Sequence, residues 1–116
     1  MSAPLPAAPP DPAELARQVA AVVAANPAVA RLDGGVFGAV ATYLPGRRLV
    51  GVRIGQGDEP VEVAVVLYAD HPFPDIVRGI RRDVAALCGG AAVDITVSDV
   101  VQRGDTDPGA VVEIGP

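Results

Sequence analysis

The chain has 116 residues, of which 50% are hydrophobic and 20% charged, and its formal net charge is −5. This length and balance predict one soluble domain with a single core, and an acidic chain is a poor binder of nucleic-acid phosphates. Lysine is absent, which excludes a P-loop lysine or a Schiff base, and one Cys with one His cannot build an ordinary structural zinc site. Composition therefore favours a non-enzymatic protein that uses no cofactor and no metal.

The first ten residues and the helix after them are predicted from proline and capping signals. Four prolines within residues 1–10 predict a disordered, Pro/Ala-rich lead. Asp11 suits the N-cap of a helix, and Pro12 suits its first position. Apolar residues at spacings of three and four continue the helix until an Asn-Pro pair at 26–27 ends it. Residues 28–32 are interpreted as a further turn.

Three β-like runs follow the first helix. Residues 36–43 are rich in Gly and Ala and give the weakest strand pattern, while residues 49–55 alternate between apolar and other side chains. Residues 60–69 alternate over their whole length and give the strongest pattern. The short Gly-containing loop at 55–60 predicts an antiparallel hairpin between the second run and the third.

A second helix and a last strand complete the predicted domain. Pro74 suits the first turn of a helix, an apolar stripe continues to Leu87, and a Gly-Gly pair at 89–90 ends the helix. Residues 92–101 then alternate as a strand. The strand–helix–strand unit over 61–101 predicts a parallel crossover.

The predicted fold class is α+β. It has two layers, with a mixed three- to four-stranded sheet and two helices on one face, in the order α-β-β-β-α-β. This single domain covers residues 11–103. Residues 104–116 are predicted to be a tail, with a short edge strand over 110–114 as the alternative.

The two faces of the predicted sheet differ in character. One is apolar and is expected to lie under the helices; its members are Val50, Val52, Ile54, Val61, Val63, Val65, Leu67, Val93, Ile95 and Val97. The other is expected to face solvent; its polar members are Arg53, Glu62, Asp94, Thr96 and Ser98. Val66 and Tyr68 interrupt the polar face, which makes them a candidate partner contact. The alternative is that residues 36–43 or the tail cover them.

Arg78, Arg81 and Arg82 form a local basic cluster in an acidic chain. Their spacing places them on one surface of the second helix. They are candidate contacts for acidic groups on a partner or for anionic lipid. The alternative is an ordinary solvated face in which Asp75 pairs with part of the cluster.

Signals for catalysis or cofactor binding are weak. His71 lies in a proline-containing loop, and Cys88 lies at the helix end that does not activate a thiol. The Gly-x-Gly at 55–57 lacks the third glycine of a dinucleotide fingerprint and precedes a strand. The Gly-x-x-Gly at 35–38 resembles the loop of a KH RNA-binding module but brings no cations. We therefore assign no catalytic, cofactor-binding or metal-binding residue.

Three passages together resemble the alkaline shock proteins, also called envelope stress response proteins, of Gram-positive bacteria. The first passage is residues 15–32, the second runs from 61 through 77, and the third is residues 93–100. Their order and spacing carry the resemblance, which spans about residues 14–101.

The resemblance implies a cytoplasmic, self-associating, non-enzymatic protein. Such a protein is expected to act at the inner face of the membrane through a membrane-anchored partner, and to support the envelope under stress. The alternative function is a small RNA- or ribosome-associated module that uses the Arg cluster, and a third is an enzyme with a metal held between chains. The bias toward Ala, Val, Gly, Pro and Arg is typical of a G+C-rich bacterium.

Overall fold

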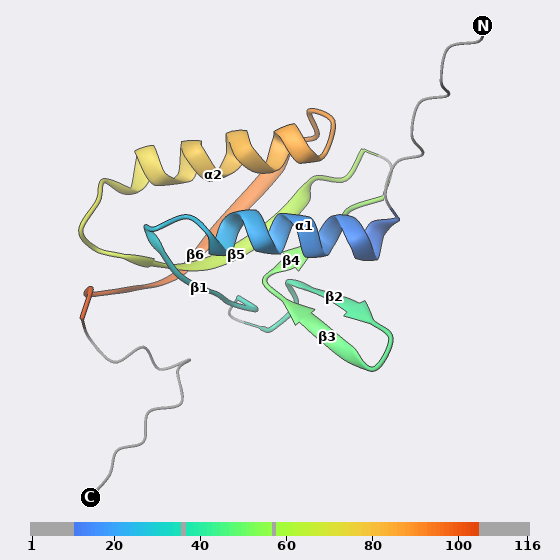
Figure 1. Ribbon diagram of the computed structural model, residues 1–116, viewed down its shortest axis with the longest axis horizontal. Coiled ribbons are helices and arrows are strands. Elements are labelled where there is room, and N and C mark those ends of the chain that lie inside the picture. The colour runs from blue at the N-terminus through green and yellow to red at the C-terminus, as the bar shows by residue number, and fades with distance from the viewer. Residues whose placement is uncertain (1–10, 36, 57, 105–116) are drawn as a thin grey trace, which may run out of the picture.

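Two helices pack on one side of a mixed sheet in the computed structural model, which describes residues 11–35, 37–56 and 58–104 (Figure 1). The helices are α1 (Pro12–Ala24) and α2 (Phe73–Leu87). The strands are β1 (Val29–Leu32), β2 (Ala41–Leu44), β3 (Arg47–Val50), β4 (Val52–Arg53), β5 (Val61–Tyr68) and β6 (Val93–Val101). The predicted lead over 1–10 and the predicted strand over 110–114 lie outside the described residues.

Both helices begin and end where local chemistry dictates. The Asp11 carboxylate accepts a hydrogen bond from the Glu14 amide at 2.8 Å, which caps the start of α1, and Pro12 takes the first helical position. At the end of α2 the chain turns through two glycines with positive φ, and the Gly90 amide donates to the Ala85 carbonyl at 2.8 Å. Both predicted helices are confirmed.

Strand β5 is the centre of the main sheet because both of its edges are paired. β6 runs parallel to it along its full length, from Val61 opposite Val93 to Tyr68 opposite Val101. The other edge of β5 is shared by two antiparallel partners: β4 pairs with its first half and β1 with its second half. The predicted mixed sheet, with its antiparallel hairpin and parallel crossover, is confirmed.

The prediction of a turn at residues 28–32 is wrong, because this segment contains β1. The Tyr68 amide donates to the Ala28 carbonyl and the Asp33 amide donates to the Ala64 carbonyl, both at 2.9 Å, which fixes β1 against β5. Four residues give too little pattern to predict a strand, and its stability comes from the unpaired half of β5. The weak strand predicted over 36–43 is reduced to β2, and Val36 is not described.

Gly51 breaks the strand predicted over residues 49–55. β3 pairs with β2 in a separate two-stranded sheet, and β4 joins the main sheet. Gly51 has a φ of +99°, and a Cβ there would lie 2.6 Å from the Leu32 Cβ. This bend moves Val50 out of the predicted core face, whereas Val52 is fully buried.

The core lies between the helices and one face of the main sheet. α1 and α2 contact each other and run in opposite directions (Figure 1). The helices contribute Ala16, Val19, Ala20, Val23, Ile76, Ile80 and Val84, and the sheet contributes Val29, Val52, Val61, Val63, Val65, Leu67 and Val93. Ile54, Ile95 and Val97, which we also predicted for this face, are partly buried at its rim. The two-layer α+β architecture is therefore confirmed.

Candidate interaction surface

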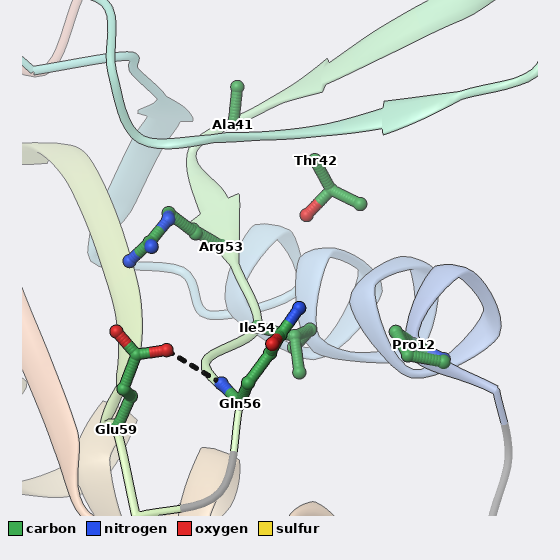
Figure 2. A pocket seen from close by; sticks show the side chains of 7 residues that line it. All are labelled: Pro12, Ala41, Thr42, Arg53, Ile54, Gln56 and Glu59. Atoms are coloured by element: carbon green, nitrogen blue, oxygen red, sulfur yellow. Dashed lines mark hydrogen bonds between the residues drawn. The ribbon is translucent and has the colours of Figure 1, made fainter.

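A cleft of about 400 Å³ opens beside the start of α1, between β2 and the loop that joins β4 to β5 (Figure 2). Its lining residues are Pro12, Ala41, Thr42, Arg53, Ile54, Gln56 and Glu59. Several of its polar groups have protein partners: Arg53 forms an ion pair with Glu62, and the Thr42 hydroxyl donates to the Val52 carbonyl at 2.6 Å. The Glu59 carboxylate accepts from the Gln56 amide at 3.0 Å. Neither His71 nor Cys88 lines this cleft.

His71 contacts a carboxylate, and Cys88 lies at the helix end that does not stabilise a thiolate. His71 is exposed, and its Nδ1 lies 2.8 Å from Asp70 Oδ1. Cys88 follows the last turn of α2, and burial raises the pKa of its thiol, which disfavours the reactive thiolate. Within the described residues, no cluster of three or more His, Cys, Asp or Glu side chains is arranged to hold a metal ion.

The Arg103 side chain joins three separate segments of the chain. We call the residues that take part the Arg103 latch: Arg103, Asp70, Tyr68 and Pro27. Arg103 forms an ion pair with Asp70 and donates to the Pro27 carbonyl at 2.8 Å. Its guanidinium carbon lies 4.1 Å from the centre of the Tyr68 ring. Hydrogen bonds from Arg103, and then from His71, lower the pKa of Asp70 to about 2. The latch connects the α1–β1 turn, the β5–α2 turn and the chain after β6.

Of the candidate contact residues Val66 and Tyr68, only Tyr68 is partly exposed. Val66 is fully buried, and Arg103 covers one side of the Tyr68 ring. Arg31 of β1 lies opposite Val66 in the sheet and forms an ion pair with Asp33 at 2.9 Å. The expectation of an exposed apolar pair is therefore wrong at Val66, because the unpredicted strand β1 brings polar side chains beside it.

Asp33 and Ser98 extend this polar cover on the same side of the sheet. Burial alone would raise the pKa of Asp33, but the Ser98 hydroxyl, the Arg31 guanidinium and the Gly35 amide together hold it below its ordinary value. Within the described residues, Ser98 Oγ is buried and reaches no hydrogen-bond partner of good geometry. We infer that Ser98 acts on Asp33 as a nearby hydroxyl dipole rather than through a fully formed hydrogen bond. Ser98 was predicted to face solvent and does not.

The three exposed arginines of α2 have different partners. Arg78 pairs with Asp75, as the alternative interpretation expected, and Arg82 lies 3.4 Å from the Asp83 carboxylate. Arg81 instead donates from Nε to the Val93 carbonyl at 3.2 Å. Two of the three charges are thus balanced by adjacent acids, and the third is directed to β6.

The outer edge of β6 is the most extensive unpaired main-chain surface of the main sheet. The Ala92 carbonyl accepts from the Val61 amide, so the main-chain groups of Val93, Ile95 and Val97 point away from β5. Among the described strands, only β5 pairs with β6.

Side chains cap this outer edge at both ends. Arg81 occupies the Val93 carbonyl, and beyond the bulge the Asp99 carboxylate accepts from the Val100 amide at 2.8 Å. Between these caps lies an open stretch, residues 94–98, which we call the edge window. Within it, the outward N–H and C=O groups of Ile95 and Val97 make no described hydrogen bond.

Apolar side chains of β6 lie in the edge window and next to it. Ile95 and Val97 are partly buried at the rim of the core, while Asp94 and Thr96 are exposed on the opposite face. Val100, two residues beyond the window, is 37% exposed. Exposed apolar area beside unpaired main-chain groups is typical of a site that another strand can cover.

The sequence predicts the strand β6 but not that its outer edge is open. The alternation over 92–101 predicted β6, but alternation does not reveal which edge of a strand lacks a partner. Asp99 was not selected by the sequence analysis, because its role as a cap depends on the bulge in β6. Arg81 was selected for its charge, whereas its position in the fold depends on a main-chain acceptor twelve residues away.

Comparison with protein-family models, curated proteins and solved structures finds no match to this chain. The resemblance to the alkaline shock proteins therefore stays a prediction from the sequence. Neither described helix combines the length and the hydropathy that crossing a membrane requires.

Proposed function

We propose that this protein is a non-enzymatic interaction protein that associates with itself through the open edge of β6. The supporting observation is the edge window, where a nine-residue strand has no second partner among the described strands. Unpaired N–H and C=O groups in an extended strand recruit another strand, because each new main-chain hydrogen bond replaces one to water and the flanking apolar side chains become buried.

The state of the candidate reactive groups supports a non-enzymatic role. The His71 ring bonds to a carboxylate that is already engaged by Arg103, and burial disfavours the thiolate of Cys88. The side chains of Arg53, Thr42 and Glu59 around the cleft are engaged by protein groups. No nucleophile with an adjacent base is found among these groups.

The cellular setting that we propose follows from the family resemblance. The protein would act in the cytoplasm, at the inner face of the membrane, through a membrane-anchored protein partner in the envelope stress response. Self-association would let one anchored partner recruit several copies, so that weak individual contacts add up. The exposed aromatic side chains Phe37 and Tyr43, 93% and 78% exposed, offer a second surface for such a partner.

Sedimentation velocity over a wide concentration series tests the self-association. The sedimentation coefficient should rise with concentration, and moderate salt should change it little, because main-chain hydrogen bonds and apolar burial are weakly screened. A protein that stays a strict monomer up to near-millimolar concentration would contradict the proposal. Crosslinking followed by capture from the source cell then tests the setting, with a small membrane protein as the expected partner and ribosomal components as the contrary result.

A further inference from the structure

We propose that β6 pairs with β6 of a second copy of this chain, antiparallel, with Thr96 opposite the partner's Thr96. The result is a two-fold dimer in which one continuous sheet crosses the interface. This inference rests on the proposed function, since it names the partner and the register of the same edge.

The two caps select this register. With Thr96 on the two-fold axis, Ile95 lies opposite the partner's Val97, and each of these pairs exchanges two main-chain hydrogen bonds. All four outward groups of each edge window are then used, and neither cap is displaced.

The neighbouring registers are worse. A shift that centres on Ile95 brings Val97 to the partner's Val93, whose carbonyl is already held by Arg81. A shift that centres on Val97 brings Ile95 to the partner's Asp99, whose main chain turns toward β5 beyond the bulge. The shift that centres on Ile95 therefore competes with the Arg81–Val93 hydrogen bond. The shift that centres on Val97 loses the two intermolecular hydrogen bonds that Ile95 would otherwise form.

The side chains are compatible with the same register. Opposite residues in an antiparallel pair point to the same face, so Ile95 meets the partner's Val97 on the helix side, where both are now only partly buried. On the other face, Asp94 meets the partner's Ser98 rather than another carboxylate. The helices of both copies then lie on one side of the combined sheet.

Charge complementarity at the ends of the window also favours a second copy as the occupant. In this register Asp99 of one copy comes next to Val93 of the partner subunit, where the partner's Arg81 is already bound. Arg81 and Asp99 thus each gain an oppositely charged neighbour from the other copy. Because of the two-fold symmetry, the Arg81–Asp99 contact forms twice in the dimer. For a chain with a net charge of −5, such local attraction offsets part of the general repulsion between copies.

Amide hydrogen exchange of the full chain locates the interface. At protein concentrations below the dissociation constant of the dimer, the Ile95 and Val97 amides should exchange fast, and at concentrations above it they should become protected. The Thr96 amide faces β5 and should be protected at every concentration. Association without protection of Ile95 and Val97 would overturn both this inference and the proposed role of the β6 edge. Protection of both amides, with a register that the position-96 variants below contradict, would overturn this inference and leave the proposed function standing. Protection already present in the monomer would also overturn it, because the chain's own residues, such as 110–114, would then cover the edge.

A charge pair at position 96 tests the register. Thr96 is exposed in the monomer, so Thr96→Asp and Thr96→Lys should both fold, but each alone places like charges on the two-fold axis and should weaken the dimer by a factor on the order of five. An equimolar mixture of the two variants should form heterodimers at least as tight as the unmodified dimer. Arg48→Glu, on the separate β2–β3 sheet, is the matched control and should leave the dimer unchanged. Unchanged dimerisation of both position-96 variants, or a mixture that fails to recover, would refute the register.

Discussion

Gly51 shows how one backbone angle separates the two sheets. Its φ of +99° belongs to the left-handed region, and its Cα hydrogens lie against Leu32 and the Ala64 carbonyl, where a Cβ would lie 2.6 Å from Leu32 Cβ and 3.2 Å from that carbonyl oxygen. The chain can therefore leave the β2–β3 hairpin and enter the main sheet within one residue.

Gly51→Ala should destabilise the protein by about 2–4 kcal/mol, since it adds a strained φ to a clash with β1 and β5. Gly46→Ala is the matched control: Gly46 has a φ of +76°, but a Cβ there meets nothing within 4 Å. The control should lose only about 1–2 kcal/mol. Urea denaturation of both variants measures the difference in unfolding free energy. Equal decreases for the two variants would show that the clash at Gly51 does not destabilise the fold.

The sequence could not reveal this role of Gly51. Val50, Val52 and Ile54 keep a period of two across the glycine, so the pattern predicts one continuous strand. The positive φ depends on Leu32 and Ala64, which are distant in the sequence, and this is why Val50 was assigned to the wrong surface.

At the scale of elements, length decided which predictions were correct. α1, α2, β5 and β6 each contain eight or more residues, and their periodicity predicted them closely. β1 has four residues and β4 has two, and both depend on the edge of β5 that they share. The same dependence explains the candidate site, because the open edge of β6 is known only once the partners of β5 are known.

The buried stripe of α2 is expected to carry most of its attachment to the sheet. Ile80 is 2% exposed, so Ile80→Ala should cost about 2–5 kcal/mol of unfolding free energy through lost burial and a cavity. Leu87→Ala, near the end of the same helix, should cost about 1 kcal/mol or less, because Leu87 is already 36% exposed. Thermal unfolding of the two variants gives the comparison, and similar losses would mean that α2 is held by its ends rather than by its stripe.

At the scale of the whole molecule, the Arg103 latch joins segments that no local pattern connects. Arg103 reaches Asp70, 33 residues away, and Pro27, 76 residues away. Neither Asp70 nor Arg103 stands out in the sequence as a candidate site residue. Contacts at such separations depend on the complete sheet, which brings the ends of β5 and β6 together.

The latch makes stability depend on pH in a definite direction. The folded pKa of Asp70, about 2, lies below its ordinary value of 3.8, so its contribution is present above 3.8 and is lost as the pH falls toward 2. Asp70→Asn should therefore lower the melting temperature at neutral pH, and the gap from the unmodified protein should close across that acidic interval. Asp58→Asn removes an exposed loop carboxylate outside the latch and serves as the control. A gap for Asp70→Asn that stays constant down to pH 2 would contradict the linkage.

The full-length pairing of β5 with β6 has a consequence during synthesis. A nascent chain presents Val61–Tyr68, most of it apolar, well before residues 93–101 have left the ribosomal tunnel. For that interval the future central strand lacks its longest partner, although α1 and then α2 can shield its core face. Translation speed between β5 and β6, and chaperones that hold extended apolar segments, should therefore govern how much of this protein reaches its native state rather than aggregates.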